Sequence, residues 1–204
     1  MKKLGEAKGA TGAAVAGALA LVLLQGSSAD AGDDGSASGA SPTVCVGTRP
    51  VGSLPGPGPG VGPPDDTPLF RVLAYVDRLG KARYSGVFTG LTVDTDDRAA
   101  DVYRIPSEEF DSDLCGAAEK GVTLRLYDTE TTKVELEALV GEIGEDMHRW
   151  DGTFSLREVA ADEAGFVLVG VDDAAKAGPI LREAYGEFGK KFIKVRHVEQ
   201  ATDL

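Results

Sequence analysis

A stretch rich in glycine, proline, serine and aspartate, residues 30–66, divides the chain and limits where it can build a core. It holds three consecutive Pro-Gly pairs from Pro55 to Gly60 and ends in Pro-Pro-Asp-Asp. Few of its side chains could be buried, so little offsets the entropy cost of ordering it. We therefore expect a disordered spacer here, flexible at first and polyproline-like later. The remaining residues 67–204 are enough for one folded domain.

The residues ahead of the spacer follow the order of a secretory signal peptide. Three lysines within the first eight residues precede an apolar run of twelve residues from Ala13 to Leu24. At a rise of about 1.5 Å per residue, this run falls short of a hydrocarbon core about 30 Å thick. Small residues at 27–31 offer cleavage sites. We expect residues 1–29 to be a cleaved signal peptide of a secreted, extracellular protein, with an uncleaved anchor as the alternative.

Acidic side chains outnumber basic ones, 33 against 21, and the formal net charge is -12. Removal of residues 1–29 would take away three lysines and one glutamate and bring the charge to -14. Such a charge repels phosphate groups, so nucleic acid and, after signal cleavage, a membrane are not expected partners. It favours solubility and a cationic partner.

The chain has two cysteines, Cys45 in the spacer and Cys115 in the domain. After export both would meet an oxidising environment, so one disulfide between them is the simplest pairing, and free or intermolecular thiols are the alternative. A closed zinc site needs about four nitrogen or sulfur ligands. The only histidines are His148 and His197. We therefore expect neither a metal site nor a cofactor.

Hydrophobic periodicity and capping residues predict the elements of the first half of the domain. Thr67 followed by Pro68 is typical of a helix start. The strand nearest Cys115 alternates leucine or valine with polar residues, which indicates one buried face. The expected elements are a helix from Pro68 to Gly80, strands over 86–93 and 101–105, a helix over 106–118 and a strand over 122–127.

The second half begins with the clearest helix, residues 132–149. Thr132 and Glu135 form a capping box, and apolar residues follow at helical spacing. Pro179 interrupts a later helical segment, so we expect either a break there or a helix that starts at Pro179. The other expected elements are strands over 154–159 and 166–171, a helix ended by Gly186 and Gly189, and a last strand over 192–198.

The order strand, strand, helix, strand thus occurs twice, in residues 86–127 and again in residues 153–198. We therefore predict an α+β fold made of two similar β-β-α-β units, an internal duplication joined by the long helix. The helices are expected to pack on a mostly antiparallel sheet.

Three segments suggest a family. They are Tyr84-Ser85-Gly86-Val87, the run from Gly165 to Ala175, and Phe192-Ile193-Lys194-Val195-Arg196-His197. Across residues 84–198 the chain resembles the pro-regions of the α-lytic protease and streptogrisin group. The resemblance implies a domain that docks on a secreted serine protease, assists its folding and inhibits it through the segment after the last strand. That segment is Glu199, Gln200, Ala201, Thr202, Asp203 and Leu204.

The chain departs from this family in one large respect. In the family a protease domain follows the pro-region, whereas here the sequence shows no Gly-Asp-Ser-Gly-Gly loop and no catalytic triad. The resemblance therefore implies a stand-alone relative that acts in trans.

The candidate catalytic residues have structural explanations. His148 is expected in the last turn of the long helix, where a positive charge is favourable. His197 shares a strand face with Ile193 and Val195, so we expect a hydrogen-bonded structural role. Two acidic clusters are expected to be a solvated turn and a helix start. The cluster expected in a solvated turn lacks the spacing of a calcium loop and consists of Asp94, Asp96, Asp97 and Asp101. The cluster expected at a helix start consists of Glu108, Glu109, Asp111 and Asp113.

Two hypotheses of different class follow. The first is a secreted, non-enzymatic protein-binding module, whose sharper form is a pro-region-like inhibitor or folding partner of a secreted serine protease. The alternative is an extracellular hydrolase of unfamiliar type that uses the acidic residues or His148.

Overall fold

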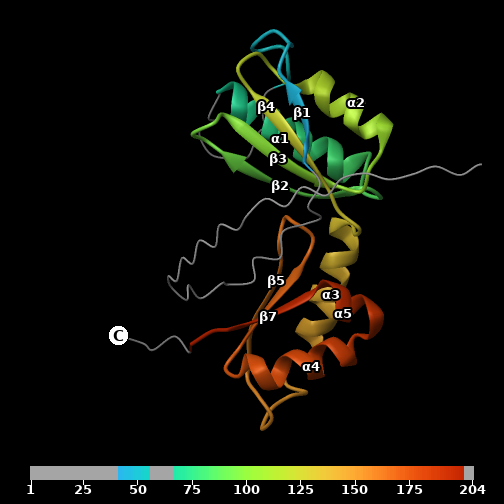
Figure 1. Ribbon diagram of the computed structural model, residues 1–204, viewed down its shortest axis with the longest axis vertical. Helices are drawn as coiled ribbons and strands as arrows, with labels where there is room; N and C mark the ends of the chain where they lie inside the picture. The colour runs from blue at the N-terminus through green and yellow to red at the C-terminus, as the bar shows by residue number, and fades with distance from the viewer. Residues whose placement is uncertain (1–40, 56–66, 200–204) are drawn as a thin grey trace, which may run out of the picture. The chain divides into compact units, whose positions relative to one another are not determined.

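The structure is a computed structural model that describes residues 41–55 and 67–199 (Figure 1). The expected signal peptide, most of the spacer and residues 200–204 lie outside the described residues. The described part is an α+β fold with five helices, one four-stranded sheet and one three-stranded sheet. None of its helices has both the length and the apolar character that crossing a membrane requires.

The first half builds a four-stranded sheet in the order β1-β4-β3-β2 (Figure 1). Strands β2 and β3 are antiparallel, β3 and β4 are parallel, and β1 is antiparallel to β4. Apolar side chains of α1 and α2 pack against β3 and β4 and are fully or almost fully buried, among them Val72, Val76, Phe110 and Leu114. The elements are β1 (Thr43–Val46), α1 (Pro68–Ala82), β2 (Phe88–Asp94), β3 (Ala99–Arg104), α2 (Glu108–Ala117) and β4 (Thr123–Asp128).

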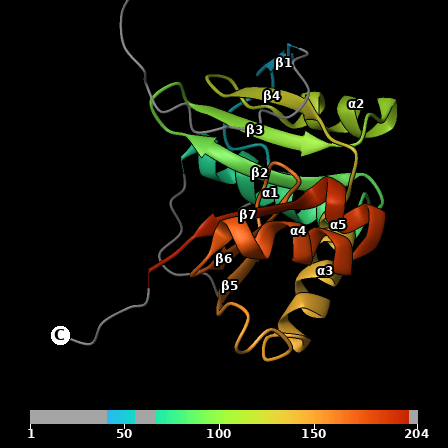
Figure 2. The ribbon, with the colours of Figure 1, turned by 60° about the horizontal axis from the view of Figure 1, so that its bottom comes forward.

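The second half forms a three-stranded sheet in the order β5-β6-β7. Strand β5 is antiparallel to β6, and β6 is parallel to β7. Helices α4 and α5 form the connection from β6 to β7 (Figure 2). A second apolar cluster includes Leu139, Ile143 and Leu181 from the helices and Val167 and Val169 from β6. The elements are α3 (Lys133–Glu145), β5 (Leu156–Ala161), β6 (Val167–Val171), α4 (Ala174–Ala184), α5 (Gly186–Phe192) and β7 (Ile193–His197).

The two halves share one pattern of strand pairing. In each half an antiparallel hairpin is followed by a helical connection that returns the third strand parallel to the second. The first unit is β2-β3-α2-β4, and the second is β5-β6-α4-α5-β7. Each sheet therefore contains both antiparallel and parallel pairs. The parallel pair arises because the helical crossover returns the chain to the same end of the sheet, so that the strand after the helix runs in the same direction as the strand before it.

The helix starts follow from local sequence. Thr67 Oγ1 accepts the N–H of Phe70 at 3.5 Å, and Pro68 occupies the first helical position of α1. At α3 the capping box is complete: Thr132 Oγ1 accepts the N–H of Glu135 at 3.2 Å, and the Glu135 carboxylate accepts the N–H of Thr132 at 2.9 Å.

The prediction of a disordered spacer is wrong for residues 41–55. Residues Thr43–Val46 form β1, whose Cys45 lies opposite Leu124 and is buried. The alternation of this short segment suits a strand with one buried face. Because the surrounding sequence is rich in glycine and proline, this strand was not predicted.

Two helix predictions in the second half are also wrong. Helix α3 ends at Glu145, not 149, so His148 lies in the turns beyond it. Helix α4 runs through Pro179 without a break, because Leu181 and Ala177 are fully buried and hold the helix in place. The residues after Gly186 form α5, which was expected only as a helix end. Gly186 has a φ of 63° and separates the two helices.

Candidate functional site

Strand β7 is an edge strand that pairs with β6 alone among the strands described. The N–H of Val198 donates to Val171 O at 2.8 Å, so the backbone of Val198 faces β6. Because backbone groups alternate along a strand, the backbone groups of Val195 and His197 face away from β6. They form an edge to which another strand could add.

The side chains on the outer face of β7 are basic. Arg196 donates to Glu158 on β5 through Nε at 2.8 Å and through its terminal nitrogen at 2.6 Å. This pair crosses β6 at Gly170, where a Cβ atom would lie 2.4 Å from Glu158 Cγ. Lys194 Nζ lies 3.5 Å from the ring centroid of Phe166, a cation–π contact. Strand β7 therefore carries two basic side chains, of which Arg196 is paired with Glu158.

The exit of the chain from β7 is anchored. Arg157 donates to the carbonyl of Val198 at 2.7 Å. His197 Nδ1 lies 2.8 Å from the carbonyl oxygen of Asp172. Glu199 follows and is exposed, while the rest of the expected partner-binding tail, residues 200–204, lies outside the described residues. The segment expected to contact a partner therefore starts from a fixed point beside the free edge.

The sequence predicts a solvated acidic turn, but in the structure one arginine binds three of its carboxylates. Arg125 on β4 donates to Asp94 at 3.0 Å, to Asp97 at 3.4 Å and to Asp101. The backbone N–H of Asp97 and the Arg125 guanidinium lower the pKa of Asp94. These three carboxylates are thus occupied by hydrogen bonds and by a cation.

The acidic start of α2 is engaged in the same way. Arg104 is almost fully buried and binds Asp111 through two hydrogen bonds, from Nε at 2.6 Å and from a terminal nitrogen at 2.8 Å. Arg83 pairs with Asp113 and Glu109. Asp111, Asp113 and Glu109 are therefore held by arginine side chains in addition to their favourable interaction with the helix dipole.

The histidines do not converge with these acids. His148 has a side chain that is 89% exposed, and its Nδ1 lies 3.4 Å from Asp151. His197 is exposed rather than partly buried as expected, although the predicted hydrogen bond is present. Within residues 41–55 and 67–199, no three histidine, cysteine or acidic side chains gather closely enough to hold a metal ion.

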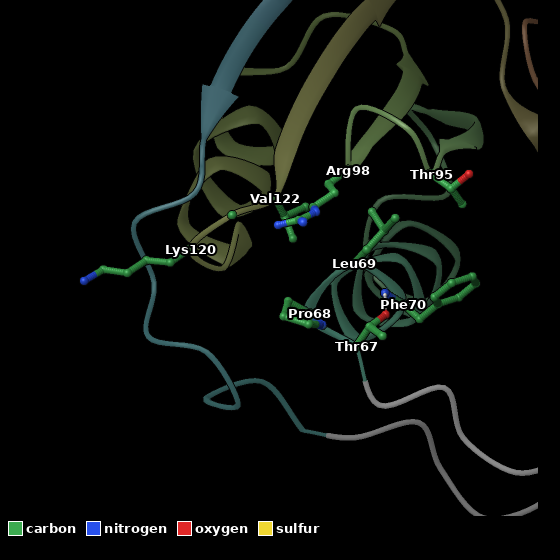
Figure 3. Close-up of a pocket in the computed structure, with 9 residues that line it drawn as sticks. Thr67, Pro68, Leu69, Phe70, Thr95, Arg98, Lys120 and Val122 are labelled. Atoms are coloured by element: carbon green, nitrogen blue, oxygen red, sulfur yellow. Dashed lines mark hydrogen bonds between the residues drawn. The ribbon is translucent and has the colours of Figure 1, made fainter.

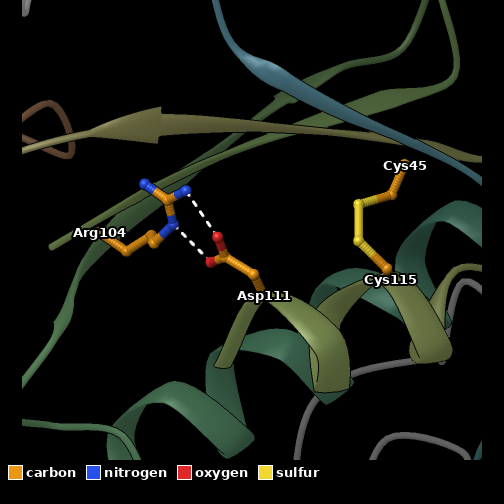
Figure 4. The surroundings of a disulfide bond; sticks show 4 residues. All are labelled: Cys45, Arg104, Asp111 and Cys115. Carbon is orange, nitrogen blue, oxygen red and sulfur yellow. Dashed lines mark hydrogen bonds and ion pairs between the residues drawn. A yellow bond between two sulfur atoms is a disulfide. The ribbon is translucent and has the colours of Figure 1, made fainter. Parts of the chain in front are cut away.

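Cys45 and Cys115 are joined by a disulfide that ties β1 to α2 (Figure 4). A buried carboxylate, Glu119, holds the loop that follows β1. It accepts the N–H of Gly52 at 3.1 Å and of Leu54 at 3.2 Å, and Arg71 on α1 donates to it at 2.9 Å. We call residues 43–54 the N-terminal strap. Sequence reasoning missed Glu119, because a single acid after a helix carries no local sign of a partner 65 residues upstream.

An open cavity of about 420 Å³ lies where the start of α1 meets the β2–β3 turn and the α2–β4 loop (Figure 3). Two basic residues, Arg98 and Lys120, are part of its lining. Neither residue was singled out in the sequence, since isolated basic side chains in turns have no distinctive spacing.

Comparison with known proteins adds no relative. No protein-family model, curated protein or solved structure matches this chain.

Proposed function

We propose that this chain is a secreted, non-enzymatic protein-binding module, and that its contact surface is the free edge of β7 together with the segment that begins at Glu199. The observation that carries the proposal is the edge itself. Val195 and His197 direct backbone groups away from β6, and the chain leaves the strand from an anchored Val198.

Strand addition suits such an edge. Main-chain hydrogen bonds supply affinity in this mode of recognition, and flanking side chains supply specificity. Lys194 would favour a partner strand that carries acidic residues, and together with Arg196 it would disfavour pairing between two copies of β7.

The sharper form of the proposal is an inhibitor or folding partner of a secreted serine protease. Its support is the resemblance of residues 84–198 to protease pro-regions, in which the segment after the last strand acts on the enzyme. Here that segment is residues 199–204.

The test uses the chain from residue 30 onward and the serine protease activity of the culture fluid in which it is found. We expect the chain to inhibit that activity in a titration. Deletion of residues 199–204 should weaken inhibition about tenfold or more, and Lys194→Glu should weaken it too. Lys133→Glu, which makes the same charge change on the first turn of α3, is the matched control. Full retention of inhibition by the deleted chain would refute the role of the tail.

Export is the other half of the proposal and has its own measurement. The intact mass and the N-terminal residue of the protein recovered from culture fluid should correspond to cleavage near residue 29. A protein found only in cell extracts, with Met1 or Lys2 at its start, would contradict secretion.

A further inference from the structure

The cavity of Figure 3 combines apolar walls with basic residues. Pro68, Leu69 and Phe70 from the start of α1 form one side, and Val122 forms part of the other. The described lining contains no carboxylate, although acids outnumber bases in the chain. The cavity is thus an apolar recess with local positive charge.

Arg98 is the residue that gives this cavity its chemistry. Its guanidinium lies beside Val122, over the gap that separates the α2–β4 loop from α1 (Figure 3). None of the ion pairs recorded for the described residues involves Arg98, although its own turn is rich in aspartate. The nearby Asp94 and Asp97 are taken by Arg125 instead. Asp96 lies in the same turn but does not line the cavity.

The backbone of Arg98 is an independent sign of constraint. Its φ is 49°, and within the described part of the chain it is the one residue other than glycine with a positive φ. Arginine in this left-handed conformation is strained, where glycine or asparagine would be the ordinary choice. Strain retained at a residue that projects into a cavity suggests a function for that side chain.

Lys120 adds a second positive charge at the rim. It extends outward from the α2–β4 loop, next to Gly121, whose φ is 83° (Figure 3). None of the recorded ion pairs of the described residues includes Lys120 either. Its flexible stem would let the ammonium group approach a bound anion as a point charge.

We propose that this cavity binds a small amphiphilic carboxylate, a molecule with one carboxylate and an apolar body. The planar guanidinium of Arg98 would bind the carboxylate through two parallel hydrogen bonds. The apolar body would lie on Leu69, Pro68 and Val122. The volume falls within the range of small-molecule sites, about 300–1,000 Å³. Such a site is separate from the edge of β7 and does not depend on the proposed protein partner.

The probe is 4-phenylbutyrate, compared with its uncharged amide and with inorganic phosphate, in calorimetric titrations of the chain from residue 30 onward. We expect the carboxylate to bind at least tenfold more tightly than the amide and than phosphate. Equal affinity for the amide would overturn the role of charge. Equal affinity for phosphate would reduce the site to a simple anion patch and overturn the amphiphile.

The decisive variant is Arg98→Gly. It removes the guanidinium and also relieves the backbone strain, so the thermal midpoint should rise or stay unchanged while affinity for 4-phenylbutyrate falls at least tenfold. Arg98→Lys keeps the charge but loses the fork, and should bind with intermediate affinity. Lys81→Gln, on the last turn of α1 and outside the cavity lining, is the control. Unchanged binding in a folded Arg98→Gly protein would refute the site.

Location is checked by NMR without any variant. Titration with 4-phenylbutyrate should shift the methyl signals of Leu69 and Val122, and it should leave those of Leu168 and Leu181 in the second half unshifted. Shifts confined to the second half would place the ligand elsewhere and overturn the proposal.

Discussion

Arg98 offers a test of backbone strain at the level of one residue. An L-residue in the left-handed region costs roughly 1–2 kcal/mol relative to the right-handed one, and glycine avoids this cost but loses more entropy on folding. We expect Arg98→Gly to raise the free energy of unfolding by about 0.5–1 kcal/mol in urea denaturation.

Gly121 is the reverse case on the same cavity. Its φ is 83°, and a Cβ atom there would meet no other atom within 4 Å. Gly121→Ala should therefore lower the free energy of unfolding by about 1 kcal/mol through the backbone alone. If both substitutions had the same sign, backbone strain would not be the cause.

Glu119 provides a prediction about pH. Its side chain is fully buried, and burial alone would raise its pKa. The hydrogen bond from Arg71 and those from the N–H groups of Gly52 and Leu54 outweigh burial, so the pKa lies below the ordinary glutamate value. The charged form therefore stabilises the fold above that ordinary value, and the stabilisation is lost as pH falls through the lower pKa of the folded state.

Glu119→Gln isolates this contribution from those of other acids. The substitution removes one charge of the buried pair with Arg71, so we expect the free energy of unfolding to fall by about 3 kcal/mol at pH 7. The free energies of unfolding of the variant and the wild-type protein should converge as the pH is lowered below about 4. Urea unfolding at matched ionic strength measures both. A difference that stays constant with pH would show that the carboxylate charge is not what holds the N-terminal strap.

Residue partners of this kind were the least predictable feature of the sequence. Arg125 reaches three aspartates because β3 and β4 are neighbours in register, with Asp101 opposite Arg125. The pairing of those strands is a long-range property that local periodicity does not encode. The same reason explains why the acidic turn was interpreted as solvated.

At the scale of elements, the disulfide of β1 carries a prediction about stability. It links residues 70 positions apart, and in the chain-entropy model a loop of that length is worth about 4 kcal/mol. Reduction of the protein, or the double substitution of Cys45 and Cys115 by serine, should lower the free energy of unfolding by a similar amount.

Hydrogen exchange then locates the effect. We expect faster exchange at Thr43–Val46 after reduction, because β1 is short and its other edge has no partner among the described strands. Exchange in β6 should be unchanged. A reduced protein with native protection throughout β1 would show that strand pairing alone holds the strap.

Strong local signals explain which elements could be predicted. Capping at Thr67 and Thr132 fixed the starts of α1 and α3 correctly. Elements held by tertiary contacts were missed or misjudged. Strand β1 depends on a distant cysteine, and α4 keeps Pro179 because its buried face outweighs the lost hydrogen bond. The free edge of β7 followed only from the strand order, which sequence alone did not supply.

At the scale of the whole molecule, the two repeated units have separate apolar clusters. Leu124 belongs to the first and Leu181 to the second, and both are fully buried. We expect Leu124→Ala and Leu181→Ala each to lower the free energy of unfolding by about 2–5 kcal/mol. Because the leucines share no cluster, their effects should add to within about 0.5 kcal/mol in the double variant.

The same pair of variants tests whether the units open separately. Hydrogen exchange should speed up mainly in α1 and β2–β4 for Leu124→Ala, and mainly in α3–β7 for Leu181→Ala. Equal acceleration over both halves in either variant would mean that the two clusters unfold as one cooperative unit.

The N-terminal strap also determines the order in which the chain can be completed. The strap is attached to residues that are made later, namely Cys115, Ala118, Glu119, Val122 and the strand β4. A polypeptide synthesised from its N-terminus therefore carries the strap unattached until α2 and β4 have emerged. The thiol of Cys45 stays open to other reactions during that wait, because its partner Cys115 is made 70 residues later.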